Sequence, residues 1–136
     1  MTTTHAALQT FLEDWVESSE GNKQGFVQLK VVLAGLQGVE LSFHPRPGVT
    51  YSLRAAITGS DRPLCVMIDV IEDEPRWLSV CFFGDMIQDP EEKGAFVPGG
   101  LLGADALCFD LETCTDELVA YVAKRIVEAH QAVVGS

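Results

Sequence analysis

The sequence predicts an α+β fold: a single-layer antiparallel sheet of four to five strands, with N- and C-terminal helices packed on one of its faces. Three observations carry this prediction. Apolar residues recur at helical spacing near both ends of the chain, a period of two replaces it in the middle, and turn-forming residues separate the short segments of that middle part. The 136 residues predict one domain, 1–136, and an apolar fraction of 47% excludes general disorder.

The first helix is predicted from an apolar stripe that ends before a run of turn formers at 18–22. Its members are Leu8, Phe11, Leu12, Trp15 and Val16. The segment 23–37 fits two patterns, because Phe26, Leu29, Leu33 and Leu36 have helical spacing while Val27, Leu29 and Val31 alternate with polar residues. We favour a helix, since the stripe extends to Leu36 and Gly38 suits the left-handed position just past a helix end.

The strands are predicted from alternation between turns. Pro47 and Gly48 have the positions of a type II turn, so the segments on either side of it should form a hairpin. A final strand at 106–111 should lie at an edge of the sheet. The predicted strands before it are 39–44, 50–57, 64–71 and 77–83.

Periodicity disappears over 84–105. The glycine-rich stretch 97–103 lacks the Lys-Ser/Thr ending of a phosphate-binding loop and the spacing of a dinucleotide fingerprint, so we interpret it as a structural Ω-like loop able to act as a lid. The last helix follows it. Thr113 and Asp116 resemble a capping box, and the apolar stripe of this helix is Leu118, Val122, Ile126, Ala129 and Val133.

Alternation divides the strand residues between two faces of the sheet. The apolar face, which should meet the helices, comprises Val39, Leu41, Phe43, Tyr51, Leu53, Ala55, Leu64, Val66, Ile68, Val70, Leu78, Val80 and Phe82. We call the other the mixed face: Glu40, Ser42, His44, Ser52, Arg54, Cys65, Met67, Asp69, Ile71, Trp77, Ser79, Cys81 and Phe83. It is too apolar for a solvated surface and too polar for a sealed core, so we expect the 84–103 segment, a second copy of the chain or a ligand to cover part of it.

Charge and cysteine spacing exclude several classes of partner. The net charge is −11, from 20 acidic and 9 basic side chains, which repels nucleic acid. No apolar run is long enough for a membrane helix, and the start of the chain lacks a basic export signal, so we expect a cytoplasmic protein without membrane contact. The four cysteines are irregularly spaced, so we expect free thiols, no disulfide, no metal and no cofactor.

The candidate site residues lie on the mixed face or at its rim and have side chains that can bind a ligand. They are His44, Arg46, Arg54, Asp69, Trp77 and Cys81. Arg54 could clamp a carboxylate or phosphate, or it could form an ion pair with Asp69 across the strands. His44 could serve as a general base or ligand, and catalysis would require Cys65, Cys81 or Ser79 within hydrogen-bond reach.

Three functions remain open on this evidence. The favoured one is a non-enzymatic interaction module that forms a homodimer through the mixed face, because tryptophan, phenylalanine, methionine and arginine are enriched at interfaces. The alternatives are a binding site for a small anionic ligand and a small enzyme that uses His44 with a nearby cysteine or serine.

Overall fold

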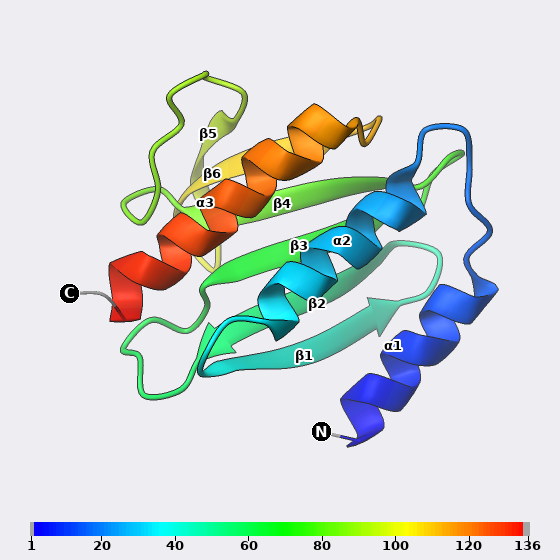
Figure 1. Cartoon of the computed structure of the whole chain (residues 1–136), viewed down its shortest axis with the longest axis horizontal. Helices are drawn as coiled ribbons and strands as arrows, with labels where there is room; N and C mark the ends of the chain where they lie inside the picture. The colour runs from blue at the N-terminus through cyan, green and yellow to red at the C-terminus, as the bar shows by residue number, and fades with distance from the viewer. Residues whose placement is uncertain (1, 135–136) are drawn as a thin grey trace.

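A computed structural model of the chain describes residues 2–134 and confirms the α+β class, with helices at both ends (Figure 1). Within these residues the helices are α1 (Thr2–Asp14), α2 (Asn22–Ala34) and α3 (Asp116–Val134). The strands are β1 (Val39–Arg46), β2 (Thr50–Ile57), β3 (Val66–Ile71), β4 (Trp77–Phe83), β5 (Ala95–Leu101) and β6 (Ala104–Leu111). The sheet thus has six strands instead of four or five, all antiparallel, in the order β1-β2-β3-β4-β6-β5.

The helices pack on one face of this sheet. Figure 1 shows α2 and α3 crossing the same side of the strands, while α1 lies beside β1. The ring of Phe11 on α1 contacts Phe43 and Tyr51, which both belong to the predicted apolar face. The helical interpretation of 23–37 is confirmed, although α2 ends at Ala34, and Gly38 uses its positive φ of 79° in the turn that enters β1.

One row of apolar side chains crosses five strands on the helix-covered face. Phe43, Leu53, Ile68, Val80 and Phe109 are successive partners in the register of β1, β2, β3, β4 and β6. The last four of them are at most 1% exposed. Each such burial contributes about 1.5–3 kcal/mol, so the apolar face sets the register of the sheet.

The hairpin between β1 and β2 closes through the predicted type II turn. The backbone N–H of Val49 donates to the carbonyl of Arg46 at 2.9 Å, which makes Pro47 and Gly48 the two central residues. Gly48 has a φ of 83°, the left-handed conformation that this turn requires at its third position and that glycine adopts without steric cost.

Two predictions for the C-terminal half of the sheet are wrong. Part of the stretch interpreted as an Ω-like loop is strand β5, and β6 lies between β4 and β5 and not at an edge. Pro98 and the two glycines after it conceal the alternation of β5, whose pairing is irregular between Val97 and Leu101. The two-residue connection to β6 places Leu102 at a φ of 52° and Gly103 at 85°, and leucine is not a residue that signals such a turn.

The irregular segment before β5 is fastened to α3. Gln88 accepts a hydrogen bond from Arg125 Nη1 at 2.8 Å and donates its backbone N–H to Glu128 Oε2 at 2.8 Å. The hydroxyl of Tyr121 donates to Asp89, which also accepts the backbone N–H of Gly94 at 2.7 Å. These bonds hold the segment on the helical side of the sheet, so it does not cover the mixed face, which was one of the three possibilities raised by the sequence.

Both ends of α3 are fixed by side chains. The N-terminal cap is Thr115, whose Oγ1 accepts the backbone N–H of Leu118 at 3.1 Å, and not Thr113 as the sequence suggests. Near the other end, His130 is 8% exposed and its Nε2–H donates to the carbonyl of Gln37 at 2.8 Å. No helix within residues 2–134 combines the length and the apolar character needed to cross a bilayer.

A buried amide joins three distant parts of the chain. Asn22 is 1% exposed, and its Nδ2 donates to the carbonyls of Arg76 at 2.7 Å and Glu112 at 3.0 Å. Its Oδ1 accepts the backbone N–H of Cys114 at 3.1 Å. The side chain therefore ties the start of α2 to the residue before β4 and to the connection after β6. The sequence pattern does not identify it, because all three partners are distant in the chain.

Replacement of Asn22 by alanine should lower the free energy of unfolding by about 2–3 kcal/mol, because the buried partners of the amide lose their hydrogen bonds. Urea denaturation followed by circular dichroism measures the change. The control is Gln28→Ala on the exposed surface of the same helix, which should change stability by less than about 0.5 kcal/mol. Equal effects of the two substitutions would show that the Asn22 contacts are energetically unimportant.

Candidate interaction surface

The face of the sheet opposite the helices carries the predicted site residues in three adjacent rows. The register gives these rows as Arg46–Thr50–Ile71–Trp77, His44–Ser52–Asp69–Ser79–Asp110 and Ser42–Arg54–Met67–Cys81–Cys108. Thr50, Asp110 and Cys108 join the mixed face, although the sequence pattern did not place them there. All six candidate site residues share this face, because the register of β1 to β4 continues without a bulge.

The centre of the mixed face holds Arg54 and Asp69 on diagonal positions of β2 and β3. Arg54 Nε donates to Ser52 Oγ at 3.2 Å, and Ser52 is 5% exposed. The ion pairs of the described residues do not include one between Arg54 and Asp69, which the sequence offered as an alternative. Burial raises the pKa of Asp69, while the hydrogen bond from Ser52 and the charge of Arg54 oppose that rise. One carboxylate oxygen of Asp69, Oδ1, is buried without a hydrogen-bond partner.

His44 lies on β1, the edge strand of this face, where it is exposed. Its Nε2 is 3.0 Å from Ser42 Oγ, two residues earlier in the same strand. Neither of the thiols that the catalytic hypothesis nominates is a free, accessible nucleophile. Cys81 is in a disulfide, and Cys65 is fully buried, which raises the pKa of its thiol to about 11. Ser79, the third nominated nucleophile, lies in the same row as His44 but three strands away, on β4. The side-chain contact of His44 is thus with Ser42, which the hypothesis did not name.

Arg46 and Trp77 lie in the row nearest the turns. Trp77 is half-buried, and its Nε1–H donates to Asp73 Oδ2 at 3.2 Å. Arg46 is exposed and precedes the β1–β2 turn. It stands four residues from the position opposite Arg54, or roughly 13 Å along the strand. Arg46 and Arg54 therefore do not converge on a single carboxylate or phosphate.

The cysteines correct the expectation of four free thiols. Cys81 and Cys108 are direct partners of β4 and β6, form a disulfide and have Cα atoms 4.1 Å apart. Cys65 and Cys114 are free, and burial raises their pKa values to about 11 and about 12. The pairing is not evident from spacing, because 27 residues separate the two cysteines and the sequence pattern did not assign Cys108 to a face of the sheet.

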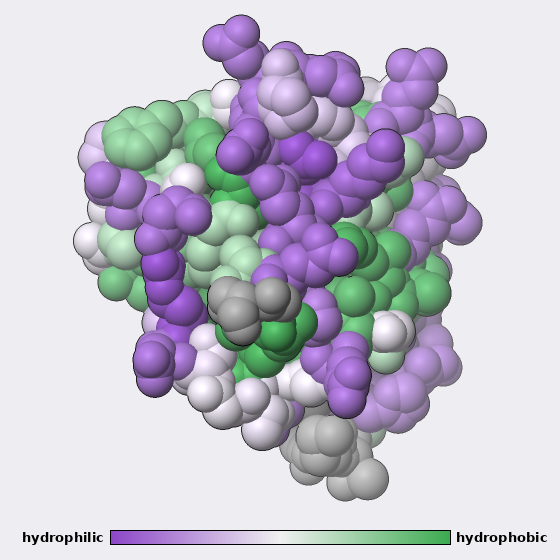
Figure 2. Space-filling view, turned by 60° about the vertical axis from the view of Figure 1, so that its left-hand side comes forward, coloured by the Kyte–Doolittle hydropathy of each residue, from purple (hydrophilic) through white to green (hydrophobic). Residues whose placement is uncertain are grey.

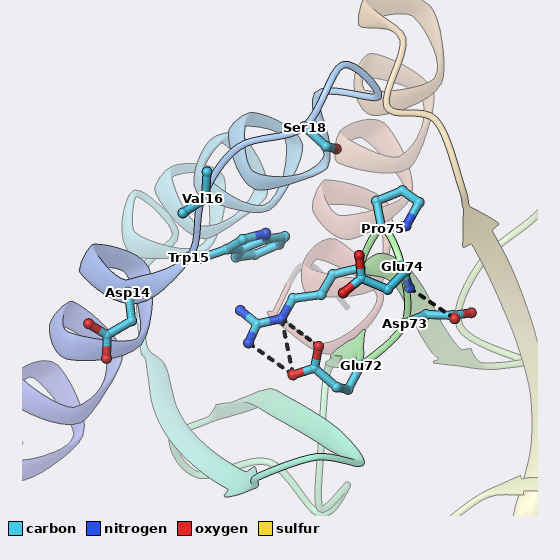
Figure 3. Close-up of a pocket in the computed structure, with 9 residues that line it drawn as sticks. Asp14, Trp15, Val16, Ser18, Glu72, Asp73, Glu74 and Pro75 are labelled. Atoms are coloured by element: carbon cyan, nitrogen blue, oxygen red, sulfur yellow. Dashed lines mark hydrogen bonds and ion pairs between the residues drawn. The ribbon is translucent and has the colours of Figure 1, made fainter.

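A partly buried cationic group lies away from the mixed face, beside a cavity of about 320 Å³ (Figure 3). The guanidinium of Arg76 lies over the rings of Phe11, Trp15 and Tyr51, at 4.9 to 5.6 Å from their centres. Its nitrogen Nη2 is 2.9 Å from Glu72 Oε1. Hydrogen bonds from Arg76 and Tyr51 lower the pKa of Glu72. Glu72 is therefore held in place by an ion pair, and its partner Arg76 stabilises the contact between α1 and the sheet.

Two other hollows in the surface are mainly apolar. One of about 420 Å³ lies between α2 and α3 around Val32 and Val127, and one of about 450 Å³ lies beside Phe83 and Phe96. Figure 2 shows apolar surface on both sides of a hydrophilic band. None of these cavities is lined by a candidate site residue, and residues 2–134 contain no cluster of His, Cys, Asp and Glu suited to a metal ion.

Comparison with family models, curated proteins and solved structures finds no match for this chain. Its function is therefore argued from the chemistry of the mixed face itself.

The raised pKa of Asp69 has a consequence for stability that can be measured. Because the folded state binds the proton more tightly than the unfolded state, the carboxyl group favours folding at low pH and this advantage is lost as pH rises through the folded-state pKa. Asp69→Asn should therefore raise the free energy of unfolding at pH 7 by on the order of 1 kcal/mol, and the gain should shrink below pH 3.8, the ordinary pKa of an aspartic acid side chain.

Chemical denaturation at both pH values measures this gain. Asp110→Asn, at an exposed position in the same row, serves as the matched control and should change stability little at either pH. A loss of stability in Asp69→Asn at pH 7 would show that the charged form of Asp69 is the favoured one.

Proposed function

We propose that this chain is a non-enzymatic interaction module that forms a homodimer through the mixed face of its sheet. The observation that carries the proposal is that all three helices pack on the opposite face, so that within residues 2–134 no helix lies over the mixed one. A sheet with large side chains on both faces normally has both faces packed.

The composition of the mixed face supports a protein partner more than a small molecule. Met67, Ile71 and Trp77 are all half-buried there, and Met67 is the direct cross-strand partner of Cys81, which forms the disulfide with Cys108. Methionine, tryptophan and arginine are enriched at protein interfaces. Ligand sites are normally concave, whereas the cavities described above lie elsewhere.

A second copy of the chain fits the distribution of charge. In a face-to-face dimer whose twofold axis runs along the strands between β3 and β4, β2 of one copy lies opposite β6 of the other. Arg54 then faces the partner's Asp110, one row away and within reach of its long side chain. In the same arrangement Asp69 faces the partner's Ser79, a hydroxyl donor. These pairs offset part of the repulsion between two chains that each carry a net charge of −11.

The size of the face is compatible with a weak or moderate dimer. Six strands at ~4.8 Å spacing and six residues at ~3.3 Å give a projected area on the order of 500 Å². Standard interfaces bury about 800 Å² of accessible surface per partner, and side-chain relief makes accessible area larger than projected area. We therefore expect a dissociation constant in the micromolar range.

Sedimentation equilibrium of the full chain over a range of concentrations tests the proposal. Arg54→Glu should weaken the dimer at least tenfold, because it places like charges opposite each other. The charge-matched control Lys124→Glu, exposed on α3, should leave the dissociation constant within about twofold.

The double variant Arg54→Glu with Asp110→Arg should restore much of the lost affinity by exchanging the two charges. A chain that stays monomeric at millimolar concentration would disprove self-association. Equal weakening by Arg54→Glu and Lys124→Glu would show that any dimer uses another surface.

A further inference from the structure

We propose that Cys81 and Cys108 form a reversible thiol–disulfide pair, a redox modification site that exchanges with low-molecular-weight thiols and disulfides. This inference concerns one chain and does not depend on the proposed homodimer.

The backbone holds the two sulfur atoms together whether or not they are bonded. Cys81 and Cys108 are direct cross-strand partners, and their Cα separation of 4.1 Å is close to the ~4.5 Å of a non-hydrogen-bonded pair in an antiparallel ladder. On the opposite face the neighbouring pair Val80–Phe109 is buried in the core at 0% and 1% exposure. The strands therefore stay paired after reduction, and the thiols remain in position to form the disulfide again.

Access to the pair is asymmetric. Cys108 is partly exposed on the mixed face, whereas Cys81 is 5% exposed. An incoming thiolate should therefore attack Cys108 Sγ, which breaks the bond to Cys81 and releases the Cys81 thiolate. Ser79 Oγ lies 3.6 Å from Cys81 Sγ, so its hydroxyl is placed to donate a hydrogen bond to that thiolate before it takes up a proton.

The reaction is completed by a second thiol. This thiol attacks the outer sulfur of the mixed disulfide on Cys108, so that the small-molecule disulfide leaves and the Cys108 thiolate is protonated. In sum, one protein disulfide and two small thiols give two protein thiols and one small disulfide. The reverse reaction oxidises the pair, with a small disulfide such as oxidised glutathione as the electron acceptor.

The other two cysteines are unsuited to the same chemistry. Cys65 is fully buried, and Cys114 packs against Gly25 so closely that a Cβ added to that glycine would lie 2.5 Å from its sulfur. Burial raises the pKa values of both thiols, so little reactive thiolate forms at neutral pH. Exchange should therefore be confined to Cys81 and Cys108.

Thiol counting across a series of glutathione redox buffers tests the proposal. The folded full-length chain is equilibrated in each buffer, quenched with acid, denatured, labelled with maleimide and weighed by mass spectrometry. We expect two labels in oxidising buffers, four in reducing buffers, and a transition that is the same from either direction. Cys65→Ala, as matched control, should keep this transition with one label fewer at each end, whereas Cys81→Ser should abolish it.

Four labels in every buffer would overturn the proposal, and so would a disulfide that glutathione reduces only after denaturation. Survival of the transition in Cys81→Ser would do the same. Circular dichroism of the wild-type chain in both end buffers checks that the fold is retained, and loss of the fold on reduction would show a structural bond instead of an exchanging one.

The order of attack is tested on the wild-type chain, so that no variant has to fold. Acid trapping early in the reduction, followed by peptide mapping, should place the mixed disulfide with glutathione on Cys108 in at least tenfold excess over Cys81. An equal distribution would contradict the assignment of Cys108 as the attacked sulfur.

Discussion

The row of apolar side chains that runs from Phe43 to Phe109 is the constraint on which the other features of this chain depend. Because successive side chains of a strand point to opposite faces, a shift of one residue would expose the whole buried set. Burial of Leu53, Ile68 and Val80 thus fixes which residues appear on the other face. The hydrogen bond from Arg54 to Ser52, the buried Oδ1 of Asp69 without a partner and the disulfide between Cys81 and Cys108 all follow from that register.

The sequence predicts the fold most accurately where this constraint is strongest. From 39 to 83 the alternation is regular and the turns contain their usual residues, so the hairpins and both faces are predicted correctly. Prediction fails in β5, where Pro98 and two glycines interrupt the pattern and Leu102 occupies a turn position at positive φ. Without β5, β6 would be an edge strand. The sequence correctly placed the candidate site residues on one face of the sheet. It did not predict their contacts, because contacts depend on pairing across strands.

Polar groups away from the mixed face have mainly structural functions. Asn22 and His130 satisfy backbone carbonyls from distant segments, and Arg76 unites an aromatic cluster with Glu72. A sequence shows the presence of such residues but not their partners, which lie up to 93 residues away. The disulfide is another contact between residues distant in the sequence, since 27 residues separate Cys81 from Cys108. Its position on the mixed face places a redox-sensitive group beside Met67 and Asp110, within the surface proposed for association.

The two outer strands also limit how copies of the chain can assemble. β1 contains Pro45, and Phe11 of α1 packs on its Phe43, while β5 contains Pro98 and an irregular pairing that disturbs its free edge. Proline and bulges at outer strands discourage the addition of further strands. Growth of the sheet into a continuous fibril is thereby disfavoured. Stacking of the mixed face of one copy on that of another is closed after two copies, so the same architecture permits a discrete assembly and resists an unlimited one.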